Sequence, residues 1–259
     1  MQTVMLTIAI RLVTTYLWGK LRGMNKTISP SQYLSDPTNE QWVILKPLIP
    51  SNIGPGQSTQ VALRAVINAI FYRVRTGCQW RYLPHDYPPT GTVYYFRKWA
   101  KDGSWSAINE TLRQQERIKE GRTPEPRGAI IDSQSVKTTE AGGERGYDAG
   151  KNVNGRKRHV MTDTLGNLLE VVVNAADTQD REGAKAVVAK LKEQTVAAIK
   201  KLWADGNYSG EPFTRWIRET LHATLEIAHR PGCKGLCRGA STMGRGAHPG
   251  LVRTLSLPE

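Results

Sequence analysis

The sequence predicts an α+β protein, with a helical N-terminal domain over residues 34–121 and a mixed α/β domain over residues 126–232. In the first domain, apolar residues recur at intervals of three and four, the period of an amphipathic helix. In the second, short β-branched runs end at turn residues, as strands do. Pro124 and Pro126 lie between the two patterns and mark the linker.

The composition indicates a polyanionic partner. Lys and Arg outnumber Asp and Glu by 36 to 23, which gives a net charge of +13 over 259 residues. This balance favours nucleic acid as the partner, with an anionic membrane surface as the second candidate. Cys78, Cys233 and Cys237 are too few and too oddly numbered for a disulfide framework, so a reducing cytoplasm is expected.

Residues 1–33 are expected to be an extension that packs poorly against the rest. The chain begins with an apolar run, but Arg11 interrupts it and Lys20 follows it, which is the reverse of an export signal. The run is also short for a membrane span, so no membrane partner is predicted. We expect residues 1–23 to lie upstream of the natural start, Met24.

Four helices are predicted in the first domain, over residues 36–49, 63–76, 90–100 and 105–120. The third helix presents Arg97, Lys98 and Lys101 on its outer face. Short helices, a tight connector and a basic helix resemble a helix-turn-helix module with its recognition helix. The alternative is an ordinary helical bundle with a solvated basic face.

Two short apolar runs of the second domain end in aspartate. Ala129 to Ile131 leads into Asp132, and a similar run beginning at Ile199 leads into Asp205. A carboxylate at the carboxyl end of a strand lies where open sheets bind ligands. The alternative for Asp132 is that it caps a turn with Ser133.

The densest basic run lies between these two strands. Residues 138–150 are expected to form a polar loop, and residues 151–159 carry the basic run. A hairpin follows, with strands at residues 159–163 and 168–174 around a Gly-Asn turn. The run would thus lie near Asp132, which favours phosphate contact over a solvated loop. Its candidate DNA contacts, with Lys137, are Lys151, Arg156, Lys157, Arg158 and His159.

The remaining elements complete a layered sheet of mixed direction. Asp180 is placed to cap a helix, with Asp177 as a weaker alternative metal ligand. The fourth strand ends at Asp205, a helix begins at Ser209, and residues 221–228 form a fifth strand. This order allows the first and fourth strands to lie side by side.

Two converging aspartates repel each other, and a divalent cation would stabilise them. Oxygen ligands and phosphate chemistry favour Mg²⁺ or Mn²⁺ at Asp132 and Asp205. Two such ions, about 3.5–4 Å apart, suit an in-line displacement at phosphorus. On a basic protein, this is the chemistry of a nuclease or a DNA strand transferase.

Five segments in order resemble the bacterial insertion-sequence transposases of the family-five group. They are Gln41-Trp42, Arg75 to Arg81, Ile131 to Lys137, Gly155 to His159 and Ala204 to Tyr208. The resemblance implies an RNase H-like catalytic domain with an Asp-Asp-Glu triad, and Mg²⁺-dependent DNA cleavage and strand transfer. It also implies a helical domain that binds terminal inverted repeats, and a homodimer. Asp132 and Asp205 match the first two triad members.

The third triad member is missing from this sequence. The family places a glutamate on a helix after the fifth strand, whereas here no acid follows Glu226 until Glu259. Residues 233–259 are rich in Gly and Arg, which is typical of disordered sequence. Codons can be chosen for Cys237 to Leu255 whose adjacent frame spells a family-like Val-Val-Glu-Arg segment. The sequence therefore predicts a frameshifted, RNase H-like domain that is incomplete at its C-terminus.

Two other interpretations of this region remain. His229, Cys233, Cys237 and His248 could bind zinc, although their spacing matches no common zinc finger. Glu226 could replace the third acid, although a surface role suits its place in a strand better. The chain is thus either a transposase or a DNA-binding remnant that occupies element ends without cutting them.

Overall fold

The computed structural model describes residues 33–50, 62–138 and 144–228. The predictions for residues 1–32 and 233–259, the zinc interpretation included, lie outside these ranges. The chain divides into two compact units between Glu116 and Arg117. We call the first the helical unit and the second the sheet unit.

The helical unit begins with a short capped helix. Helix α2 covers Asn39–Leu45 and continues as a 3₁₀ turn, Lys46–Leu48. It begins later than the Asp36-Pro37 start that the sequence predicted, because Thr38 is the N-cap. The Thr38 side chain accepts from the Gln41 amide, and the Gln41 side chain accepts from the Thr38 amide. This reciprocal capping box satisfies two amides that the helix itself cannot.

Three longer helices complete the unit and agree with the predicted ones. They are α3 (Leu63–Thr76), α4 (Pro89–Lys101) and α5 (Ser104–Lys119). Helix α3 ends at Gly77, which adopts φ 74°, a left-handed conformation that glycine reaches without strain. Helix α5 runs past the boundary between the units, so the structural division lies a few residues before the predicted linker.

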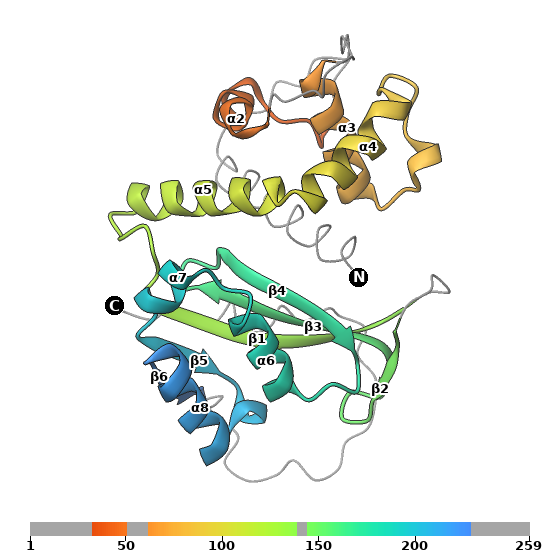
Figure 1. The fold of residues 1–259 in the computed structure, drawn as a ribbon. Coiled ribbons are helices and arrows are strands. Elements are labelled where there is room, and N and C mark those ends of the chain that lie inside the picture. Colours follow the sequence, from red (N-terminus) through yellow and green to blue (C-terminus); the bar gives the residue numbers. More distant parts are fainter. Residues whose placement is uncertain (1–32, 51–61, 139–143, 229–259) are drawn as a thin grey trace. The chain divides into compact units, whose positions relative to one another are not determined.

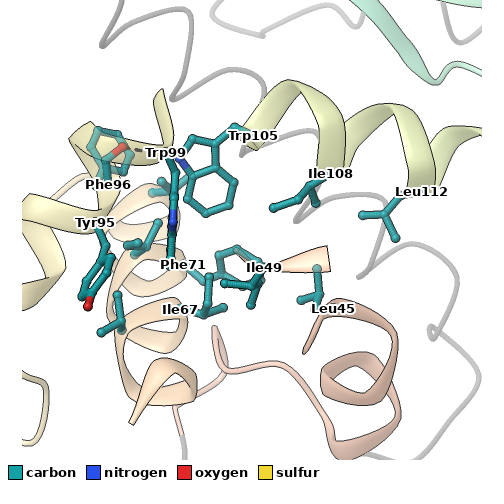
Figure 2. Close-up of a cluster of buried hydrophobic side chains, with 13 residues drawn as sticks. Leu45, Ile49, Ile67, Phe71, Tyr95, Phe96, Trp99, Trp105, Ile108 and Leu112 are labelled. Carbon is teal, nitrogen blue, oxygen red and sulfur yellow. Dashed lines mark hydrogen bonds between the residues drawn. The ribbon is translucent and has the colours of Figure 1, made fainter. Parts of the chain in front are cut away.

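The core of the helical unit is aromatic. Side chains from α2, α3, α4 and α5 converge around Trp99 and Phe71, which are 1% and 3% exposed (Figure 2). The Trp99 and Trp105 rings meet edge to face, with centroids 5.5 Å apart, an arrangement that adds to the burial of their area. Arg73 lies over the Trp80 ring at 4.7 Å and so ties the connector after α3 to this core.

The sheet unit contains a mixed sheet of six strands (Figure 1). The strands are β1 (Gly128–Lys137), β2 (Gly146–Asp148), β3 (Val153–Asp163), β4 (Leu168–Ala175), β5 (Lys201–Ala204) and β6 (Thr224–Ile227). The order is β2-β3-β1-β5-β6, and β4 also pairs with β3. Strand β3 is antiparallel to β1, β2 and β4, whereas β1, β5 and β6 are mutually parallel.

Three helices accompany the sheet: α6 (Asp180–Val188), α7 (Glu193–Ala198) and α8 (Glu211–Leu221). Helix α6 packs on β3 and β4, and α8 packs on β6 (Figure 1). The described chain is therefore α+β, with N-terminal helices followed by an RNase H-like mixed sheet with helices. Among the described residues, no helix combines the length and apolar character that crossing a membrane requires.

The loop predicted over residues 138–150 was partly wrong, and the basic run lies within a strand rather than at its entry. Residues 138–150 contain strand β2, and most of residues 151–159 belong to β3, which begins earlier than the predicted second strand. The reason is that β1 continues through Lys137, so the basic residues find a strand to pair with. Val136 lies opposite Arg156, and Lys137 lies opposite Gly155.

Candidate active site

The structure brings the strands of the two candidate aspartates together. Strands β1 and β5 are parallel neighbours, with Ile130 opposite Trp203. Asp132 lies two positions after Ile130 within β1, and Asp205 lies two positions after Trp203, one residue past the end of β5. Parallel strands that are in register bring such residues side by side. The predicted adjacency of the first and fourth strands is thus confirmed. Asp132 was predicted at the carboxyl end of its strand, which was wrong, because β1 continues through Lys137; only Asp205 follows the end of its strand.

Each aspartate is fixed by a local hydrogen bond. Asp132 Oδ1 accepts from the Ser133 amide at 2.8 Å, and Asp205 Oδ1 accepts from the Asn207 amide at 3.0 Å. Asp205 is the N-cap of the 3₁₀ turn Gly206–Tyr208. Asp132 belongs to an extended strand and caps no turn, so the alternative given for it does not describe the structure.

The two carboxylates affect each other electrostatically. Burial raises the pKa of Asp132, and the charge of Asp205 raises it further. The Lys151 ammonium acts in the opposite direction. A pair of like charges that is partly desolvated favours either a proton or a cation.

Lys151 is the basic residue best placed beside Asp132. Its Nζ donates to the Ser133 carbonyl at 3.1 Å and approaches Ser133 Oγ at 3.4 Å. The side chain is exposed. Of the predicted phosphate contacts, Lys151 therefore combines access to solvent with a fixed place next to a candidate ligand.

Lys157 faces the interior and contacts protein carboxylates. Its Nζ lies 3.1 Å from Asp180 Oδ1 and 3.4 Å from Asp148 Oδ2, and it donates to the Thr178 carbonyl at 2.9 Å. Only 6% of Lys157 is exposed. Lys157 was predicted to contact DNA phosphate, but in the structure it is the counter-ion of Asp148 and Asp180 inside the protein.

Asp180 is held by this ion pair rather than by helix capping. Gln179 occupies the N-cap position of α6, where no side-chain cap forms, and Asp180 lies in the first turn. The predicted capping role of Asp180 was wrong. Asp177, the other acid considered, is exposed and lies beside Gly146 of β2.

His159 is also in the interior. It is fully buried, and neither ring nitrogen has a hydrogen-bond partner in the part of the chain that the structure describes. A Cβ added to Gly183 would lie 2.1 Å from the His159 ring, so the ring lies directly against helix α6. Burial lowers the pKa of His159 to about 4. A neutral buried imidazole is poorly suited to the predicted contact with phosphate.

The other predicted DNA contacts have diverse surroundings. Arg97, Lys101 and Lys137 are exposed, and Lys98 is half-buried beside the Tyr94 ring. Arg156 and Arg158 are half-buried, and Arg156 Nε donates to the Glu144 carbonyl at 3.2 Å. These six residues remain predicted contacts.

Tyr208 belongs to the site, although sequence analysis gave it no role. It is fully buried, and its hydroxyl has no partner in hydrogen-bonding geometry among the described residues. Burial raises the pKa of this hydroxyl, as do the charges of Asp180 and Asp132, whereas the adjacent Ser133 side chain lowers it. The available signal was its place in Asp205-Gly-Asn-Tyr208, one 3₁₀ turn after the aspartate.

Carboxylate oxygens suit a hard cation, and here the protein would bind it on one side only. Mg²⁺ commonly binds through one or two carboxylates and leaves its other positions to water and phosphate. Within the described ranges, no three His, Cys, Asp or Glu side chains lie together as a closed metal site would need. Glu226 pairs with Lys201 on the surface, as its strand position indicated. Asp132 and Asp205 are the two carboxylates that could hold such a cation.

Comparisons with known proteins agree with this geometry. Residues 38–130 match a family described as transposase of IS4/5 family, and residues 123–231 match the transposase DDE domain. An uncharacterized 16.2 kDa protein of insertion element IS402 from Burkholderia cepacia is 28% identical over 120 residues. That alignment covers 42% of this chain and 77% of the relative. No solved structure matches. Both matched families are transposases, and the chain therefore belongs to the insertion-sequence DDE transposases of the IS4/5 family.

Proposed function

We propose that the chain acts on the ends of its own insertion sequence, where it binds terminal inverted repeats and supports Mg²⁺-dependent DNA cleavage and strand transfer. The observation that carries this proposal is the parallel pairing of β1 with β5, whose register, continued two residues past Ile130 and Trp203, aligns Asp132 with Asp205. Lys151 beside Asp132 supports it, because a fixed exposed cation suits a phosphodiester.

Asp132 and Asp205 would hold Mg²⁺ or Mn²⁺. Bound there, the cation supplies the positive charge that an in-line displacement at phosphorus needs on its attacking and leaving oxygens. Two backbone amides and one side chain keep that geometry fixed. The amides of Ser133 and Asn207 orient the carboxylates, and Lys151 would orient a phosphate oxygen of the DNA.

The helical unit would bind the terminal repeats. Arg97 and Lys101 project from α4 to solvent, while Phe96 and Trp99 of the same helix are buried in the core. This division leaves a basic face on a well-packed helix, which suits the recognition helix of a helix-turn-helix module. Changing Arg97 and Lys101 together to Gln should weaken binding to end DNA and flatten its dependence on salt.

The decisive experiment measures Mn²⁺ binding by electron paramagnetic resonance, together with cleavage of DNA that carries the element's ends. Asp132→Asn and Asp205→Asn should each abolish tight Mn²⁺ binding, because a neutral amide replaces a charged ligand. Glu219→Gln is the matched control, since Glu219 is exposed on α8. Unchanged Mn²⁺ binding in both Asn variants would refute the cation site.

A second candidate function is a DNA-binding remnant that occupies element ends without cutting them. It is favoured by the absence of any acid between Glu226 and Glu259 in the sequence, where the third carboxylate is expected. Binding to end DNA with Mn²⁺ bound but no cleavage product would support this role. Resequencing the codons from Leu236 to Glu259 tests its proposed origin in a frameshift.

A further inference from the structure

The turn that carries Lys151 joins strands β2 and β3. Its four residues lie between Asp148 and Val153, which pair with each other at the ends of the two strands. All four are exposed, and exposed connecting segments are generally more mobile than the strands they join. The Tyr147 hydroxyl donates to Asn152 Oδ1 at 2.5 Å and closes one side of the turn. A fixed place for Lys151 beside the candidate cation site therefore needs a further anchor.

Asp148 provides that anchor. It is buried, and its Oδ1 accepts from the Lys151 amide at 3.1 Å. Its Oδ2 accepts from the Ser135 hydroxyl of β1 at 2.5 Å and lies 3.4 Å from Lys157 Nζ of β3. Burial raises the pKa of Asp148, but the hydrogen bonds from Ser135 and the Lys151 amide, together with the charge of Lys157, outweigh burial and lower it. The carboxyl group is therefore ionised at neutral pH, and ionised acceptors form the stronger hydrogen bonds.

The turn contacts β1 at two serines of the same strand face. Asp148 accepts from Ser135, while Lys151 Nζ donates to the Ser133 carbonyl at 3.1 Å and approaches Ser133 Oγ at 3.4 Å. Side chains two positions apart in a strand point to the same face. Asp148 thus fixes the backbone of Lys151, and from there the ammonium reaches the residue that follows Asp132. An ammonium has three donors, so the contacts with Ser133 leave Lys151 able to bind a phosphate oxygen.

We propose that Asp148 is a positioning residue for the DNA reaction, which holds Lys151 where its ammonium meets a phosphate at the cation site. This inference rests on the proposed function of Asp132 and Lys151. A donor that is already in place needs no reorganisation when the phosphate binds, so a fixed cation stabilises the phosphate better than a mobile one. Asp148 itself would contact neither the DNA nor the cation.

The test is the affinity of Asp148→Asn for duplex DNA that carries the element's end. Fluorescence anisotropy measures it on the full chain, with Mg²⁺ present and at several salt concentrations. Charge alone predicts tighter binding, because the variant removes a negative charge from a chain whose net charge is +13. Our inference predicts weaker binding, with a salt slope reduced by up to about 1, because one phosphate contact is lost. The two expectations therefore have opposite signs.

Asp180→Asn is the matched control. Asp180 also pairs with Lys157, and its side chain is 11% exposed, against 10% for Asp148. It lies on α6 rather than beside the turn in sequence, so Asp180→Asn should bind the DNA at least as tightly as wild type. The thermal midpoint should fall in both variants, which separates lost stability from lost binding. Equal weakening of DNA binding in both variants would assign the effect to Lys157 and overturn the inference.

Two further variants sharpen the result. Ser135→Ala removes one hydrogen bond to Asp148 and keeps its charge, so it tests the same anchor if Asp148→Asn does not fold, and it should weaken DNA binding by a smaller factor. Lys151→Ala should weaken binding most, and Asp148→Asn should add nothing in that background.

The outcomes separate this inference from the proposed function. Wild-type or tighter binding in Asp148→Asn and Ser135→Ala, while Lys151→Ala binds weakly, would overturn this inference and leave the proposed function standing. Wild-type binding in Lys151→Ala would overturn this inference together with the proposed role of Lys151. The cation site is tested independently, by Mn²⁺ binding in Asp132→Asn.

Discussion

Both units of this chain bury an apolar core and some charged side chains, which in the helical unit include Asp36, Arg113 and Glu116. The helical unit fills its core with aromatic and aliphatic groups such as Trp99, Phe96 and Ile70. The sheet unit also has an apolar core, but next to its candidate site it buries Lys157 and His159. Buried charges and unpartnered polar groups reduce stability unless their partners are well placed. What distinguishes the sheet unit is therefore that its buried Lys157 and His159 lie close to the candidate aspartates.

The comparison predicts that the units differ in how they respond to loss of a charge. Lys157→Ala should reduce the stability of the sheet unit by about 3–5 kcal/mol, because Asp148 and Asp180 would keep buried charges without their counter-ion. Hydrogen exchange followed by peptide mass spectrometry reads each unit separately. Protection should fall in the peptides of β2, β3 and α6 and stay unchanged in those of α3 and α4.

Lys201→Ala is the matched control for that change. Its partner is Glu226, and the two side chains are 44% and 51% exposed. Exposed ion pairs contribute roughly 0–1 kcal/mol. If Lys201→Ala and Lys157→Ala had equal effects, the buried pair would not be the special feature of the sheet unit.

A fall in pH should destabilise the sheet unit more than the helical unit. The pKa of His159 is about 4 in the folded chain, against about 6.5 when unfolded. Below pH 6.5 the unfolded chain binds a proton that the folded chain refuses, so stability falls as the pH falls from 6.5 to 4. The total loss is about 3 kcal/mol. Asp180 opposes this shift, whereas Lys157 and Lys151 add to it.

His159→Asn isolates the contribution of the histidine, because other acids also titrate in this range. The difference in unfolding free energy between wild type and variant should shrink toward pH 4 and stay constant above pH 7. Urea unfolding monitored across the pH range gives this difference. A constant difference throughout would mean that the buried imidazole titrates normally.

The smallest expected effect comes from Gly183→Ala. Alanine is normally favoured over glycine in a helix by about 1 kcal/mol. Here the new Cβ would lie 2.1 Å from the His159 ring, and overpacking of this kind costs about 1–3 kcal/mol. The variant should therefore lower the thermal midpoint. In a His159→Ala background the same change should be neutral or stabilising, since the ring is then gone.

Local sequence patterns predicted most helices and strands correctly. They failed where a strand forms by pairing with residues far away in the sequence. The apolar period of α3 and its stop at Gly77 are local, and the structure agrees with both. The basic run was placed before the second strand, which was predicted to begin only at His159. Its strand is stabilised by the long extension of β1, which a local pattern does not reveal.

The features of the candidate site also fall into those that follow from the sequence and those that only the tertiary structure decides. The sequence by itself determined the two aspartates, since each ends a short apolar run, and it determined the family through its ordered segments. Only the tertiary structure decided that Lys157 and His159 point inward and that Tyr208 is fully buried. The physical reason is that side chains alternate along a strand. Which of its two faces meets helix α6 depends on packing between elements that are far apart in the sequence.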